Sequence, residues 1–157
     1  MTEPPTDFDP ALLQQLGRVV VHWSYVERLV SDLFVWAVEG QAEPLTVVTA
    51  NISTGTLSEW IRNVLDARED YSDQANDIRD LLTDISEVRT ERNTLVHGVW
   101  ALSTVPPSAI VQVIRLDRSA VVSELVVTPA DLDALSHHIC DLAIKLREIL
   151  LKLGVTA

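Results

Sequence analysis

The chain has 157 residues, of which 47% are hydrophobic and 22% charged, and this suits one domain of ordinary size. Its formal net charge of −11 argues against a protein that coats nucleic acid through a broad basic face, although it still allows a small basic cleft. The single cysteine, Cys140, excludes a disulfide within one chain and makes a reducing cytoplasm the default expectation. The apolar runs are too short for a membrane span, and the acidic, Pro-rich start is unlike a signal peptide.

The first predicted element is a long helix that begins at about Pro10 and ends near Gly40. Asp9 suits the N-cap, proline suits the first helical position, and glycine suits the end. Residues 1–8 are expected to form a flexible tail before a single domain over residues 9–157. Apolar residues recur along this helix with a helical period: Leu12, Leu16, Val19, Val20, Trp23, Val26, Val30, Leu33, Phe34 and Ala37.

A second helix is predicted after a connector whose structure the sequence leaves open. Residues 43–50 fit either a short helix or an extended segment, and residues 51–55 have the composition of a turn. Thr56 and Glu59 match a capping box, so the helix is predicted to begin there and to end near Arg68. Its apolar face would comprise Leu57, Trp60, Ile61, Val64 and Leu65.

A third helix is predicted from about Ile78 to near Gly98, after a polar loop or frayed helix start at residues 70–77. The composition then changes to Val and Ile, which predicts two or three antiparallel strands. These strands fall at about residues 99–103, 109–116 and 121–127, with turns at Pro106-Pro107 and residues 117–119.

The last predicted helix begins at Thr128-Pro129, a cap followed by a proline, and ends at Gly154. Its apolar face would comprise Leu132, Leu135, Ile139, Leu142, Ala143, Leu146, Ile149, Leu150 and Leu153. The expected fold class is therefore mainly α: a bundle of about four main helices with a small antiparallel β insert between the third and last helices.

Ionisable residues interrupt the apolar faces of the first and third helices. At about 100° per residue, Arg89 and Arg92 fall within the apolar sector of the third helix, and Asn93 falls at its edge. Glu27 falls within the apolar stripe of the first helix by the same rule. Because an unpaired buried charge is costly, Glu27 is expected to pair with Arg89 or Arg92. One interpretation is a purely structural ion pair, with His97 as a helix-terminal residue bonded to a carbonyl.

The residues from Glu91 to Trp100 read E-R-N-T-L-V-H-G-V-W. This run resembles the R-N-x-x-x-H motif of the HEPN superfamily, all-helical bundles that carry the motif late in an inner helix. Several branches are similar to this chain in placing glycine and an aromatic residue soon after the histidine. The Trp-x-x-x-Glu spacing of Trp23 and Glu27 is similar to first helices of that superfamily. The motif covers about residues 91–100, whereas the helix order covers most of the chain.

The resemblance implies a HEPN-like domain over residues 9–157 and a metal-independent endoribonuclease of a toxin or defence system. It implies a homodimer whose two motifs face one cleft, with RNA as substrate and an antitoxin as a possible partner. Arg92, Asn93 and His97 would be the catalytic residues. His97 would move a proton while the 2′-hydroxyl of RNA attacks the adjacent phosphate, since histidine titrates near neutral pH. Arg92 would hold that phosphate, and Asn93 would orient either group. From its position on the first helix, and not from the resemblance, we expect Glu27 to aim Arg92.

The alternative function is a HEPN-like scaffold that binds a partner protein or nucleotide without catalysis, with Arg92 paired structurally to Glu27. No cofactor or metal is expected, because the chain has no spacing typical of a structural zinc site and no Gly-rich phosphate loop. His22 lies off the main stripe, Cys140 is expected to be a packing residue, and the adjacent His137 and His138 point in different directions on a helix.

Overall fold

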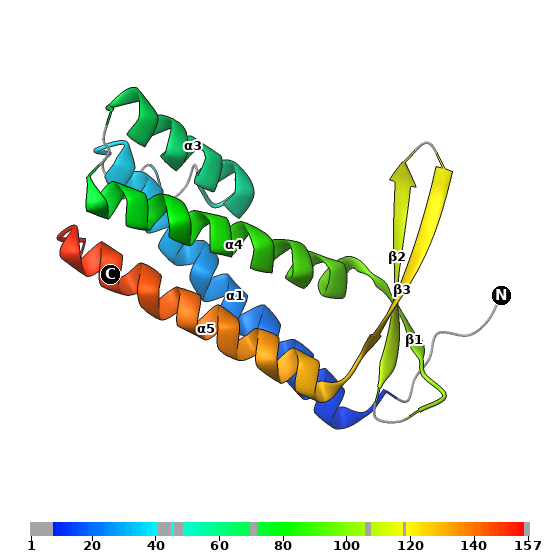
Figure 1. Cartoon of the computed structure of the whole chain (residues 1–157). Helices are drawn as coiled ribbons and strands as arrows, with labels where there is room; N and C mark the ends of the chain where they lie inside the picture. The colour runs from blue at the N-terminus through cyan, green and yellow to red at the C-terminus, as the bar shows by residue number, and fades with distance from the viewer. Residues whose placement is uncertain are drawn as a thin grey trace. The chain divides into compact units, whose positions relative to one another are not determined.

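The computed structural model describes residues 8–40, 45, 49–69, 72–105, 108–117 and 119–155. The helices are α1 (Pro10–Ala37), α3 (Thr54–Ala67), α4 (Asp73–His97) and α5 (Pro129–Lys152), and the strands are β1 (Val99–Leu102), β2 (Ala109–Asp117) and β3 (Ser119–Val127) (Figure 1). This order confirms the predicted fold class, a mainly helical chain with a small antiparallel sheet between the third and last of these helices.

The chain divides into two compact units, and the helices α1, α4 and α5 each contribute residues to both of them. The sheet unit comprises Met1–Val21 and Val88–His138, and so holds the start of α1, the end of α4, the three strands and the start of α5. The helical unit comprises His22–Glu87 and Ile139–Ala157, and so holds α3 and the remaining parts of α1, α4 and α5. A single domain over residues 9–157 is still an expectation, and the predicted tail falls almost entirely outside the described residues.

In the sheet unit the strands follow one another as an antiparallel meander in the order β1-β2-β3. Leu102 pairs with Ala109, and Ala109 in turn pairs with Val127 on the other side. Ala109, Val111 and Val127 are buried, which places alternate residues of β2 on one covered face. The three predicted strands are confirmed to within about two residues at each end.

The core of the helical unit is filled by apolar side chains from four helices. The predicted helical stripes are confirmed there, except that Trp60 is 40% exposed and packs its ring against Phe34 at a centroid distance of 5.7 Å. The side chains that are at most 2% exposed in this core include Trp23, Val26, Leu29, Leu33, Leu57, Ile61, Leu65, Ile78, Leu82, Ile85, Ile139, Leu142 and Leu146.

Polar caps start the helices, and two of the three predicted caps are confirmed. The Asp9 carboxylate accepts a hydrogen bond from the Ala11 backbone N–H at 2.8 Å. At α5, Thr128 Oγ1 accepts a hydrogen bond from the Asp131 backbone N–H at 3.2 Å. Thr128 Oγ1 and the Thr128 N–H in turn donate to the Asp131 carboxylate, and these bonds hold the pKa of that carboxyl below its ordinary value. The predicted Thr56 cap of α3 is wrong: the N-cap is Ser53, whose Oγ accepts from the Thr56 N–H at 3.2 Å.

Helices α5 and α1 are each followed by a residue with positive φ, which is a glycine after α5 and a glutamate after α1. Gly154 follows α5 with φ of 77°, which confirms its predicted role. After α1 the residue with positive φ is Glu39, at 51°, while the N–H of Gly40 bonds the carbonyl of Val35. The end near Gly40 is therefore confirmed, although a glutamate takes the left-handed conformation.

The remaining predictions for the loops and the surface have mixed outcomes. The undecided segment 43–50 lies mostly outside the described residues. Helix α4 begins at Asp73, so part of the polar stretch at residues 70–77 is its first turn.

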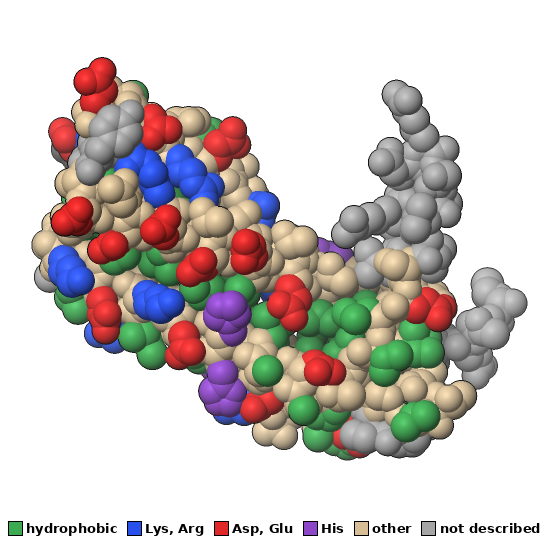
Figure 2. All heavy atoms as spheres, in the orientation of Figure 1, with side chains coloured by type: hydrophobic (Ala, Val, Ile, Leu, Met, Phe, Trp, Pro, Cys, Tyr) green, Lys and Arg blue, Asp and Glu red, His purple; other side chains and the backbone are tan. Residues whose placement is uncertain are grey.

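In the part of the chain that is described, no helix is long and apolar enough to cross a membrane. Acidic side chains are spread over the face drawn in Figure 2, in keeping with the net charge of −11.

Candidate functional site

The motif found in the sequence occupies the last turns of α4, within the sheet unit. Arg92 and Asn93 are both half-buried, and Arg92 Nη1 donates a hydrogen bond of 3.0 Å to Asn93 Oδ1. This bond turns the guanidinium of Arg92 toward the side of the helix that carries Asn93. The structure therefore brings the first two residues of the motif into direct contact.

His97 is the final residue of α4, and its side chain is exposed. Residues four apart on a helix lie on one face with Cβ atoms about 6 Å apart, so Asn93 and His97 are neighbours one turn apart. Residues five apart point about 140° away from each other, so Arg92 reaches this face only through its bend toward Asn93. Among the described residues, none hydrogen-bonds the imidazole of His97, which leaves both ring nitrogens available to solvent.

A second arginine stands one turn before the motif on the same helix. Arg89 is half-buried, and its Nε is fully buried without a hydrogen-bond partner among the described residues. The Nε of Arg92 is buried as well. Two guanidinium groups therefore lie three residues apart at this end of α4, with the carboxylates of Glu87 and Glu91 on the same stretch of helix.

Gly98 and Trp100 fix the end of the helix that carries the motif. A Cβ on Gly98 would lie 2.3 Å from Val111 Cγ1 and 2.6 Å from the Thr94 carbonyl oxygen, so only glycine lets β2 approach here. The indole N–H of Trp100 donates to the Leu95 carbonyl at 2.7 Å, which satisfies one of the unpaired carbonyls of the last turn. Both residues therefore have a structural role beside the motif.

The comparisons with known proteins add no relative to this picture. No family model, no curated protein and no solved structure matches the chain. The resemblance to the HEPN superfamily therefore rests on the motif at residues 91–100 and on the helix order.

The predicted position of Glu27 inside the first helix stripe is wrong. Glu27 is exposed, because the buried stripe of α1 is centred on Val26 and Val30 and leaves Glu27 at its outer edge. Its Oε1 accepts a hydrogen bond of 3.3 Å from Thr54 Oγ1 at the start of α3. A role in aiming Arg92 stays a prediction.

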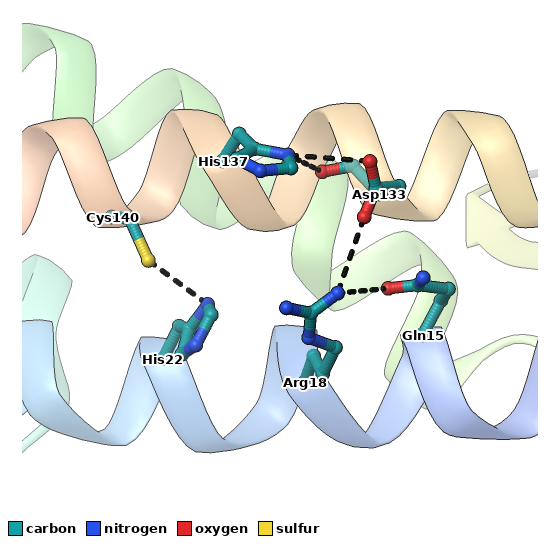
Figure 3. A network of polar contacts seen from close by, with 6 residues as sticks. All are labelled: Gln15, Arg18, His22, Asp133, His137 and Cys140. Atoms are coloured by element: carbon teal, nitrogen blue, oxygen red, sulfur yellow. Dashed lines mark hydrogen bonds and ion pairs between the residues drawn. The ribbon is translucent and has the colours of Figure 1, made fainter.

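The histidines and the cysteine form contacts that the sequence did not reveal (Figure 3). In the helical unit, Cys140 Sγ lies 3.1 Å from His22 Nδ1. In the sheet unit, His137 Nδ1 lies 2.9 Å from the carbonyl oxygen of Asp133, whose carboxylate also meets Arg18 at 3.4 Å. Because His22 and Cys140 are 118 residues apart, no local spacing could have indicated their contact.

A polar cavity in the helical unit was also missed. It has a volume of about 320 Å³ and is lined by side chains of α1, of the segment before α3 and of the first turns of α3. Its lining includes Glu27, Arg28, Asp32, Thr49 and Thr54. In the part of the chain that the structure describes, no group of three or more His, Cys, Asp or Glu side chains is arranged to hold a metal ion.

Proposed function

We propose that the chain is a HEPN-like endoribonuclease that cuts RNA without a metal ion, with Arg92, Asn93 and His97 as its catalytic residues. The observation that carries the proposal is the bond from Arg92 Nη1 to Asn93 Oδ1, one turn before an exposed His97. This bond turns the Arg92 guanidinium, the proposed phosphate-binding group, toward the side of α4 that carries His97, the proposed proton-transfer group. A toxin or defence role belongs to the same proposal.

The chemistry needs a proton moved and negative charge stabilised. The 2′-hydroxyl loses its proton and bonds the adjacent phosphorus, while the 5′-oxygen leaves and gains a proton. The products are a 2′,3′-cyclic phosphate and a 5′-hydroxyl. His97 exchanges the proton as general base or acid, and Arg92 holds the phosphate oxygens as charge builds on them. Asn93 keeps the guanidinium in place through the bond to Arg92.

A homodimer completes this proposal. A single copy presents one histidine to the cleft, although the reaction removes one proton and delivers another. A second motif across a two-fold axis supplies the second histidine and a second arginine. Light scattering measures the mass of the purified protein in solution. A mass equal to one copy of the chain at the assay concentration would contradict the homodimer.

The test is cleavage of a mixed RNA in the presence of EDTA by the wild type and by matched variants. His97→Ala and Arg92→Ala are expected to lower the rate by about 10²–10⁴-fold. The controls are His138→Ala and Arg147→Ala, which replace exposed residues of the same types on α5 and should retain activity. Circular dichroism checks that every variant is folded. No cleavage by the wild type, or cleavage that survives both motif substitutions, contradicts the proposal.

A non-catalytic scaffold that binds a protein partner or nucleotide is the second candidate. The observation in its favour is that Arg92 is half-buried with a buried Nε and is already bonded to Asn93, as in a structural role. Under this hypothesis Arg92→Ala destabilises the fold, His97→Ala has no effect on stability, and no RNA is cut. The same set of variants therefore separates the two functions.

A further inference from the structure

The cavity beside α3 has the size of a small-molecule site. It is open to solvent on one side and has a volume of about 320 Å³, and ligand pockets in proteins span about 300–1,000 Å³. Part of its lining is apolar, from Ala50, Ile52 and Leu57, and the rest is polar. A cavity of this composition fits a ligand with one polar head and a short apolar body.

One negative charge on the cavity wall is uncompensated. Arg28 Nε lies 3.1 Å from both carboxylate oxygens of Asp32, so these two residues form a neutral pair. Glu27 also lines the cavity, and among the described residues none forms an ion pair with it. The charge that faces a ligand is therefore that of the Glu27 carboxylate.

One buried hydroxyl group bonds this carboxylate, and a second lies on the cavity wall. Thr54 is 4% exposed, and its Oγ1 donates to Glu27 Oε1 at 3.3 Å. Thr54 is held in turn by the first turn of α3, which Ser53 caps. Thr49, 3% exposed, adds a second buried hydroxyl to the lining. The second carboxylate oxygen of Glu27 is left to accept hydrogen bonds from a ligand.

The charges favour a cation over an anion. The start of α3 also borders the cavity, and a helix N-terminus carries about half a positive charge. Glu27 opposes it with a full negative charge, and the guanidinium that could hold an anion is paired with Asp32. An anionic ligand would therefore meet net repulsion, whereas an ammonium or guanidinium group would neutralise Glu27.

We propose that this cavity binds a small organic cation, a primary ammonium or guanidinium group on a short aliphatic chain. The cationic head bonds the Glu27 carboxylate, and the chain lies against Ile52 and Leu57. The site lies in the helical unit, whereas the proposed catalytic residues lie in the sheet unit, and its test measures binding and not RNA cleavage.

The experiment uses three probes with the same four-carbon chain: butylammonium, butanol and butyrate. Amide chemical shifts of the full-length, isotope-labelled protein are followed during titration with each probe. Butylammonium is expected to shift the amides of Ile52, Thr54 and Leu57 in a saturable manner, whereas butanol and butyrate leave them unchanged. Equal responses to the cation and to butanol would overturn the proposal.

Matched variants assign the binding to Glu27. Glu27→Gln keeps the shape of the side chain and should weaken butylammonium binding at least about tenfold. Glu59→Gln replaces another exposed glutamate, on α3 but outside the cavity lining, and should bind as the wild type does. Thr54→Val, which removes the hydroxyl donor, should weaken binding to a smaller extent and serves if Glu27→Gln does not fold. Unchanged affinity in the folded variant also overturns the proposal.

Discussion

The two halves of α4 differ in how they use the buried side of one helix. In the helical unit, Ile78, Leu82 and Ile85 are at most 1% exposed, and the acidic residues Asp80 and Asp84 face solvent. In the sheet unit, Val88 and Leu95 continue the buried side, but the positions seven residues after Leu82 and Ile85 hold Arg89 and Arg92, both half-buried. Because burying part of a guanidinium costs more than burying an aliphatic side chain, the second half gives up apolar packing that the first half keeps. Departures of this kind are expected where a helix carries a site.

The largest effect is expected from the first half of α4. Leu82→Ala removes a completely buried side chain and should lower the free energy of unfolding by about 2–5 kcal/mol. Asp84→Ala, on the exposed side, should change it by less than about 0.5 kcal/mol, as should His97→Ala at the end of the second half. Urea unfolding of the three variants measures this. A cost for His97→Ala as large as that for Leu82→Ala would remove the contrast between the halves.

A pair of glycine substitutions tests how tightly the chain is packed at the end of the second half of α4. Gly98→Ala places a Cβ 2.3 Å from Val111 Cγ1 and should cost about 1–3 kcal/mol. Gly17→Ala adds the same methyl group where nothing lies within 4 Å, in the interior of α1, and should stabilise by about 0.5–1 kcal/mol. Thermal unfolding should therefore show shifts of opposite sign. Stabilisation by both substitutions would mean that the end of α4 is loosely packed.

The order of elements could be predicted from the sequence because hydrophobic periods and caps are local features. Asp9, Thr128 and Gly154 act as the sequence indicates. The start of α3 could not be fixed in the same way, since both Ser53 and Thr56 are good cap residues. The burial of Thr54 and Leu57, a tertiary effect, accompanies the earlier start. The preferences of residue types for helix caps do not take such burial into account.

The candidate site could be predicted only in part. The motif placed Arg92, Asn93 and His97 together at the end of a helix, and the bond between Arg92 and Asn93 gives that grouping a geometry. Glu27 was misplaced because a fixed angle per residue does not locate the centre of a stripe. The contact between Glu27 and Thr54 joins two helices, so no spacing within either helix indicates it.

A substitution of Arg89 should reverse the usual direction of a mutation. Arg89→Met keeps the length of the side chain and removes an Nε that is buried without a partner among the described residues. We expect stabilisation of about 1 kcal/mol, because an unsatisfied buried donor costs about that much or more. Arg92→Met breaks the bond to Asn93 and should give no such gain. Urea unfolding separates the two, and destabilisation by Arg89→Met would show that its guanidinium is needed for the fold.

The smallest effect concerns the start of α5, which belongs to the same unit as the end of α4. Hydrogen bonds from the side chain and then the backbone of Thr128 lower the pKa of Asp131 below its ordinary value of 3.8. The stabilisation by this carboxylate is therefore complete above that value and is lost as the pH falls through the lower pKa of the folded state. Asp131→Asn should cost less than about 1 kcal/mol near neutral pH, because the group is exposed. The difference from the wild type should shrink as the pH is lowered below about 4. A difference that stays constant with pH would mean that the charge of Asp131 adds nothing to the cap at α5, which would then depend on the shape and hydrogen bonds of the side chain alone.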